Sequence, residues 1–161
     1  MIVVSDTTAV SNLVQIGHLE LLKKIYSRII IPKGVHDELL VLDKFEIPIQ
    51  EILKSDWIEV RKVESEVLLK KFSTELDLGE AEAIALAIEL NAEYLLIDEK
   101  LGRRIAKENH IPIIGTLGIL LKGRELGLIK NMRGQMDDLR KIGFWISDGL
   151  YDKILDLEKS I

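Results

Sequence analysis

The chain has 161 residues, 47% of them hydrophobic, and its 22 lysines and arginines against 27 aspartates and glutamates give a formal net charge of −5. This length and hydrophobic fraction are typical of one packed domain and exclude a disordered chain. Zero cysteines exclude a disulfide scaffold, thiolate zinc sites and cysteine nucleophiles. The acidic net charge argues against wholesale wrapping of nucleic acid and leaves room only for a local basic patch.

Nothing in the sequence indicates export or membrane insertion. The segment 1–6 lacks the basic start and apolar stretch of a signal peptide. The longest uncharged apolar stretch, 111–121, is shorter than the roughly 18 residues that a membrane span needs. We therefore expect one cytoplasmic domain over residues 1–161, with no membrane contact.

Four short β-branched runs recur along the chain, at 2–4, 29–31, 94–97 and 111–114. None alternates with polar residues, which is typical of strands buried on both faces. Helical spacing occupies the segments between them, at 13–26, 33–42, 80–91 and 101–109. This order predicts an α/β domain with a mostly parallel central sheet.

Two further regions complete the predicted organisation. The segment 57–63 alternates in part and is interpreted as an edge strand. From Leu117 onward the pattern is helical, with a helix at 117–126 and a C-terminal helical appendage at about 130–161, whose last helix begins at a Ser147 cap.

Aspartates follow two of the predicted strands directly. Asp6 follows the first strand and Asp98 the third, and strand ends of a parallel sheet share one edge, where ligands bind. The neighbouring hydroxyls of Ser5 and Thr7 could orient a carboxylate or a water there. The alternative is that each aspartate only caps the helix or turn that follows it.

Glutamates on two predicted helices could join these aspartates. Glu38 borders the apolar stripe of the helix 33–42, whereas Asp37 is expected to face water; alternatively, Glu38 is a boundary carboxylate held by a cation. In the alanine-rich helix that follows Gly79, the spacing predicts that Glu80 points inward and Glu82 outward. Glu80 could instead form a capping box with Asp77.

The resulting set of four carboxylates, Asp6, Glu38, Glu80 and Asp98, predicts a divalent cation. Hard oxygen ligands suit Mg²⁺ or Mn²⁺, and like charges gathered this closely are strongly unfavourable without a counterion. A metal bound by carboxylates supports phosphodiester hydrolysis by activating water and by clamping phosphate.

A basic stretch follows Asp98. Lys100, Arg103, Arg104 and Lys107 lie along one side of a predicted helix and could bind a nucleic-acid backbone. The alternative is a solvated face with Glu99–Arg103 and Arg104–Glu108 pairs. Thr116, after the last predicted strand, could present its hydroxyl at the same edge or simply cap the next helix.

Four motifs in this order resemble a PIN-like nuclease domain close to the VapC toxins. They are Val3-Val4-Ser5-Asp6-Thr7-Thr8, Ile31-Pro32-x-x-Val35-x-x-Glu38-Leu39, Leu78-Gly79-Glu80-Ala81-Glu82-Ala83 and Leu95-Leu96-Ile97-Asp98. The resemblance covers essentially the whole chain. It implies a three-layer α/β/α fold with extra C-terminal helices and Mg²⁺- or Mn²⁺-dependent cleavage of RNA.

The resemblance also assigns residues and partners. It implies Asp6, Glu38, Glu80 and Asp98 as the catalytic acids, with Glu82 as an alternative to Glu80 at the metal. We hypothesise an endoribonuclease acting as the toxin of a toxin–antitoxin pair, and expect a homodimer and an antitoxin partner. The alternative hypothesis is a non-catalytic PIN-like binding or scaffold protein in which the acidic residues are structural.

Overall fold

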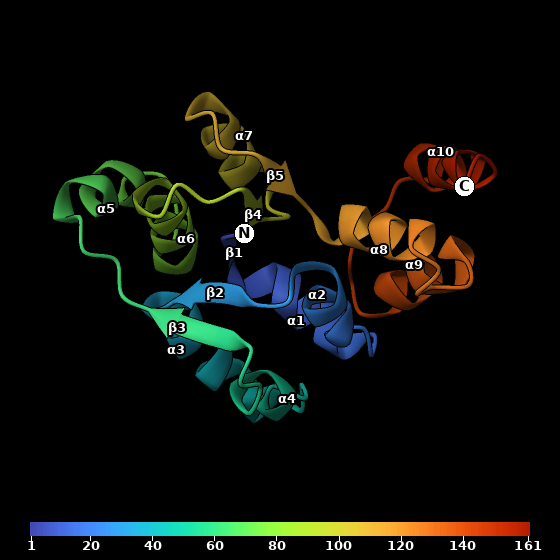
Figure 1. The fold of residues 1–161 in the computed structure, drawn as a ribbon, viewed down its shortest axis with the longest axis horizontal. Helices are drawn as coiled ribbons and strands as arrows, with labels where there is room; N and C mark the ends of the chain where they lie inside the picture. The colour runs from blue at the N-terminus through green and yellow to red at the C-terminus, as the bar shows by residue number, and fades with distance from the viewer.

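A five-stranded parallel sheet forms the centre of the protein in the computed structural model, which describes residues 1–161 (Figure 1). Its strand order is β3-β2-β1-β4-β5. The strands are β1 (Val3–Ser5), β2 (Ile29–Pro32), β3 (Ile58–Arg61), β4 (Tyr94–Leu96) and β5 (Ile113–Ile114). All neighbours pair in parallel, and β3 is the edge strand that the sequence predicts in 57–63.

Successive strand residues point into two different cores. Val3 and Leu96 belong to a core of 26 buried residues on one face of the sheet. Val4 and Leu95 belong to a core of 17 buried residues on the other face. Because strand side chains alternate between faces, apolar runs without polar alternation cover both faces, and the protein is a three-layer α/β/α domain, as predicted.

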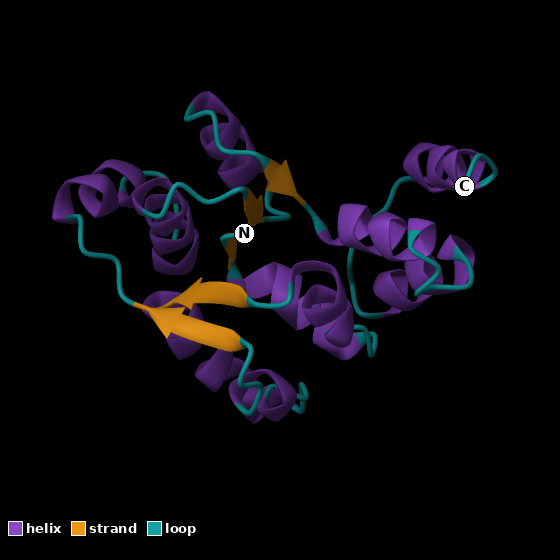
Figure 2. Ribbon diagram, viewed as in Figure 1, coloured by secondary structure: helices purple, strands orange, loops and turns teal.

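The helices divide between the two faces (Figures 1 and 2). The larger core takes side chains from α1 (Thr7–Gln15), α2 (Glu20–Tyr26), α3 (Lys33–Leu42), α4 (Gln50–Leu53), α8 (Thr116–Glu125), α9 (Met132–Lys141) and α10 (Asp148–Glu158). The smaller core takes them from α5 (Glu66–Ser73), α6 (Leu78–Glu89) and α7 (Lys100–Glu108). A short 3₁₀ helix, Asp43–Phe45, follows α3.

The single helix predicted over 13–26 is wrong, because the chain forms two helices there. Gly17 has a φ of 76°, in the left-handed region that glycine adopts readily, and this ends α1. The His18 N–H then donates to the Leu13 carbonyl at 2.8 Å, which satisfies one of the terminal carbonyls of the helix. In contrast, the helix predicted over 33–42 has the bounds of α3.

The C-terminal helices pack into the body of the protein. Met132, Met136 and Leu139 of α9 and Ile154 of α10 are buried in the same core as α1 and α2. The Ser147 hydroxyl accepts the Leu150 N–H at 3.1 Å, so the predicted cap of the last helix is confirmed. No helix in the structure has the length and apolar character that crossing a membrane requires.

Candidate active site

The order in which the chain adds strands to the sheet reverses between β1 and β4. From β1 the chain proceeds to β2 on one side, and it later returns to β4 on the other side. Ligands of open parallel sheets bind at such a switch point, outside the carboxyl ends of the strands. Asp6 and Asp98 follow these two neighbouring strands, and the Asp6 N–H donates to the Leu96 carbonyl at 3.0 Å. The topology therefore brings both aspartates to the switch point.

The two carboxylate oxygens of Asp6 differ in their hydrogen bonding. One carboxylate oxygen, Oδ1, accepts the Ala9 N–H at 2.9 Å and caps α1. The other oxygen, Oδ2, is buried and has no hydrogen-bond partner, and the residue is 1% exposed. Burial raises the pKa of Asp6 well above its usual value, and the neighbouring acids Asp98, Glu80 and Glu99 raise it further. The unpartnered oxygen is a ready ligand for a cation.

Asp98 is held by three donors. The Thr116 N–H donates to Oδ1 at 2.8 Å, and the Thr116 hydroxyl donates to Oδ2 at 2.5 Å. The Asn12 amide also donates to Oδ2, at 3.4 Å. Thr116 thus orients a carboxylate, while Gly115 occupies the cap position of α8. Sequence reasoning missed Asn12, whose only signal is an amide side chain among the apolar residues of α1.

Glu38 reaches across from α3 to the start of α6. Its carboxylate accepts the Thr7 hydroxyl and, at 3.1 Å, the Gly79 N–H. A Cβ at Gly79 would overlap Glu38 Oε2, so only glycine leaves room for this carboxylate. Asp37, by comparison, is exposed and pairs with Lys33 at 3.2 Å, as expected for a residue facing water.

The Ser5 hydroxyl is not hydrogen-bonded to any of the four acidic side chains, whereas the Thr7 hydroxyl is bonded to Glu38. The buried Ser5 hydroxyl donates to the backbone carbonyl of Asp6 at 3.0 Å. Ser5 is the last residue of β1, which is buried throughout. Its hydrogen bond therefore stabilises the strand end that carries Asp6.

Glu80 lies at the first turn of α6 and lines the site. Its N–H donates to Asp77 Oδ1 at 2.9 Å, which confirms Asp77 as the cap, but the Glu80 carboxylate does not accept the Asp77 N–H, so the capping box is incomplete. Partial burial raises the pKa of Glu80 to about 7, and the nearby carboxylates of Asp77, Glu99 and Glu38 contribute in the same direction. Glu80 therefore exchanges a proton near neutral pH.

The predicted outward orientation of Glu82 is wrong. Glu82 is 8% exposed, and its Oε2 is buried without a hydrogen-bond partner. It packs against the first turn of α3, where a Cβ at Gly34 would overlap Oε2. Burial raises the pKa of Glu82, while the Gly34 N–H counteracts that rise. The carboxylate therefore faces the positive end of α3 rather than the cleft occupied by Glu80.

Eight residues line a cleft of about 400 Å³ at this edge of the sheet. They are Asp6, Thr7, Thr8, Glu38, Asp77, Glu80, Glu99 and Leu101. Three of the four predicted acids thus share one cleft, and Asp98 lines the two neighbouring clefts. Glu99 and Asp77 are additional acids of the site that sequence reasoning assigned only to surface pairing and capping.

The four predicted cations of α7 line an adjoining cleft of about 600 Å³. Lys100, Arg103, Arg104 and Lys107 surround it together with Asp98 and Leu101. Arg103 donates from Nη1 to the Ile97 carbonyl at 2.8 Å, which fixes its guanidinium at the end of β4. The Arg104–Glu108 pair forms at 3.8 Å between exposed side chains, a weak interaction that leaves the cation available, and the Glu99–Arg103 pair does not form.

The family comparison identifies this architecture. The model of the DUF3368 family, described as a PIN domain, matches residues 2–160. The chain belongs to this PIN-domain family. Members of the family are generally nucleases that use divalent metals, so the fold is nuclease-like. The match spans nearly the same residues as the resemblance seen in the sequence.

One solved structure supports the fold of this PIN domain. A PilT N-terminus domain protein from the hyperthermophilic archaeon Sulfolobus solfataricus is similar, with a TM-score of 0.58 and 23% sequence identity. The similarity covers 76% of this chain and 92% of that chain. No curated protein matches the sequence.

The donor set of the PIN-domain cleft fits a hard divalent cation. All candidate ligands are carboxylate oxygens, and one of them, Asp6 Oδ2, is buried without a partner. No three acidic or histidine side chains converge closely enough to form a complete cage. The donor set therefore fits a divalent cation that would take only some of its ligands from the protein.

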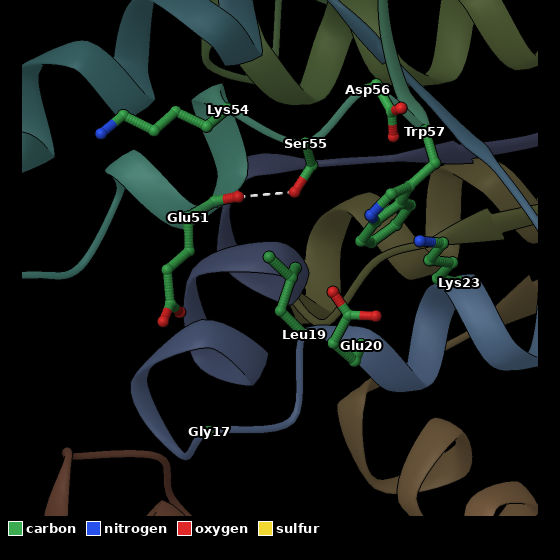
Figure 3. Close-up of a pocket in the computed structure, with 9 residues that line it drawn as sticks. All are labelled: Gly17, Leu19, Glu20, Lys23, Glu51, Lys54, Ser55, Asp56 and Trp57. Carbon is green, nitrogen blue, oxygen red and sulfur yellow. Dashed lines mark hydrogen bonds between the residues drawn. The ribbon is translucent and has the colours of Figure 1, made fainter.

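A further cleft of this PIN domain lies near the amino ends of the strands (Figure 3). It is lined by the Gly17 turn after α1 and by residues that precede β3, among them Trp57. Its charged side chains carry both signs, including Lys23, Lys54 and Glu51. This cleft is remote from the carboxyl ends of the strands, and it gathers none of the predicted site residues.

Proposed function

We propose that this PIN domain is a metal-dependent endoribonuclease whose active site is the acidic cleft at the switch point. The observation that carries this proposal is the buried, unpartnered Oδ2 of Asp6, in a cleft that also holds Glu38 and Glu80. An uncompensated buried carboxylate is costly, and a divalent cation is the counterion that its neighbours favour. The cationic cleft of α7, which Asp98 also lines, shares Leu101 with the acidic cleft.

The proposal gives each acid a role. Asp6 and Asp98 would hold Mg²⁺ or Mn²⁺, with Glu80 beside the metal rather than bound to it. When bound, the metal would supply an activated water and a positive charge against the scissile phosphate. Glu80, with its pKa raised to about 7, is suited to accept or donate a proton near neutral pH. Glu38 accepts hydrogen bonds from Thr7 and Gly79 and so links α3 to α1 and to the start of α6 at one wall of the cleft.

RNA as the substrate is favoured by the resemblance to the VapC toxins and by the placement of the α7 cations. A phosphate seated beside Arg103 and Arg104 would lie next to Asp98, because all three line one cleft. The role as a toxin with an antitoxin partner, and the homodimer, rest on the same resemblance. Growth arrest on expression, relieved by the product of a neighbouring gene, would test the toxin role.

The direct test incubates the purified chain with a labelled single-stranded RNA and with the DNA of the same sequence. We expect cleavage of the RNA in Mg²⁺ or Mn²⁺ and none in chelator. Cleavage that persists in chelator would contradict metal dependence. A protein that neither cleaves RNA nor binds Mn²⁺ at millimolar concentration in calorimetry would instead favour the non-catalytic binding protein.

A further inference from the structure

An apolar groove of about 600 Å³ begins at the candidate active site and extends toward the C-terminal helices. Nine of its 14 lining residues are hydrophobic. One wall comes from β5 and the start of α8, and the other comes from residues 144–145 and α10. Asp98 and Arg103 also line this groove. A ligand in the groove would therefore reach Asp98, one of the proposed catalytic acids.

Trp145 is the most exposed large hydrophobic side chain of the protein. It is 81% exposed and lies in the connection between α9 and α10. Trp57, the other tryptophan, is 8% exposed. Such exposure of an indole is costly to solubility and is typical of a side chain that stacks on a partner.

The backbone around Trp145 is fixed on both sides. Phe144 packs against the larger core, and its N–H donates to the Leu139 carbonyl at 3.0 Å. Ile146 is buried in that core, and its carbonyl accepts Arg140 Nη2 at 2.7 Å. The exposed indole is thus mounted on an ordered segment, which lowers the entropy cost of stacking on a ligand.

The charges beside the groove select the class of ligand. Arg103 borders the groove at the active-site end, and Lys153 of α10 also lines it, as does Trp145. An aromatic face and cations in one groove are the combination that binds single-stranded nucleic acid, since the bases stack and the phosphates pair with the cations. A duplex would hide its base faces from such a groove.

We propose that Trp145 is a stacking platform for an unpaired nucleobase of the RNA substrate, a few nucleotides from the phosphate held at Asp98 and Arg103. This inference rests on the proposed ribonuclease function and adds to it a base-stacking contact outside the acidic cleft. Lys153 contacts the phosphate that joins the stacked base to the remainder of the strand. The groove thereby sets the direction in which the strand leaves the active site.

The test measures RNA binding in chelator, where no cleavage is expected, by anisotropy of a labelled single-stranded decamer and by tryptophan fluorescence. We expect RNA to quench the fluorescence of the full-length protein, because Trp145 is the exposed indole. Trp145→Ala should raise the Kd about tenfold, and Trp145→Phe should restore most of the affinity without the quenching. A decamer of abasic ribose phosphates should bind both the native protein and Trp145→Ala with equal, weak affinity.

Phe45→Ala is the matched control, because Phe45 is an aromatic residue that is 68% exposed on the 3₁₀ helix after α3 and lines none of these clefts. An unchanged Kd in Trp145→Ala, in a protein that cleaves RNA, would overturn the stacking role and leave the proposed function intact. RNA binding that depends on Trp145, in a protein that does not cleave RNA with any metal tested, would support the stacking role and contradict the proposed ribonuclease function. A change in oligomeric state in Trp145→Ala with an unchanged Kd would show a contact between copies of the chain and would overturn the inference.

Discussion

Thr116 binds both oxygens of the Asp98 carboxylate, through its N–H at 2.8 Å and its hydroxyl at 2.5 Å. Thr116 is fully buried at the first turn of α8, whereas Asp98 follows β4. The carboxylate therefore lies at the N-terminal end of a helix, where backbone N–H groups favour negative charge. This contact fixes one proposed metal ligand relative to β5 and α8.

Replacing Thr116 with valine removes the hydroxyl donor and leaves the backbone donor in place. We expect RNA cleavage to fall about tenfold, because hydrogen bonds that orient metal ligands have effects of that size. The free energy of unfolding should fall by about 1.5–3 kcal/mol from the loss of a hydrogen bond to a charged group. Metal-dependent cleavage assays and chemical denaturation measure these two effects. Thr116→Ser, which keeps the hydroxyl, should retain most activity, and equal losses in both variants would contradict an orienting hydroxyl.

Gly79→Ala tests the position of Glu38. The added Cβ would overlap Glu38 Oε2 and force that carboxylate to move. We expect cleavage to fall about tenfold while the helix itself gains the propensity of alanine. Gly149→Ala in α10 is the control, because its Cβ would meet nothing within 4 Å. If the two variants have the same cleavage rate, the Glu38 position has no part in activity.

Glutamine substitutions distinguish the roles of Glu80 and Glu82 in the first two turns of α6. Glu80 lines the cleft with Asp6, whereas Glu82 packs against Gly34 of α3. We expect Glu80→Gln to lower cleavage by about 100-fold, as expected for the loss of a proton-transfer group. Glu82→Gln should leave the cleavage rate close to that of the native chain. The reverse order of rates in the same assay would assign the role at the active site to Glu82 instead of Glu80.

Stability without metal should depend on pH in a defined direction. The folded chain raises the pKa of Glu80 from 4.5 to about 7, and burial raises that of Asp6 in the same direction. The folded state therefore holds protons that the unfolded chain releases, so this contribution is present below pH 4.5 and is lost as the pH rises through about 7.

Thermal unfolding in chelator at about pH 5 and about pH 8 measures this contribution. We expect the unfolding temperature to fall more between these pH values in the native chain than in Asp6→Asn/Glu80→Gln. Mn²⁺ should stabilise the native chain more at the higher pH, because the metal competes with protons for the same oxygens. Parallel pH profiles for the two proteins would show that these carboxyls do not carry the effect.

The sequence predicts the features of the fold that depend on local composition. Buried parallel strands are continuous apolar runs, so four strands of the sheet are recognisable from the order of residues alone. The edge strand β3 is recognisable from its partial alternation of apolar and charged residues. The break between α1 and α2 is harder to predict, because the surrounding residues keep helical spacing and only the left-handed Gly17 ends the helix.

The side-chain orientations depend on neighbours that are distant in sequence. Helical periodicity alone places Glu82 outward, but α3 approaches α6 closely at Gly34 and encloses its carboxylate. The Asn12 contact to Asp98 joins α1 to the end of β4, and no spacing rule connects those two residues. The strand-end acids are predictable because the parallel topology alone brings Asp6 and Asp98 to one edge.

The most direct measurement of the central claim compares the RNA cleavage rates of Asp6→Asn and the native chain at the same Mn²⁺ concentration. The asparagine keeps an oxygen that can accept the Ala9 N–H, so the cap of α1 and the fold should persist, as circular dichroism can verify. We predict a loss of at least about 100-fold in rate, because the buried oxygen that would bind the metal loses its charge. A folded Asp6→Asn protein that cleaves at the native rate would contradict the proposed active site.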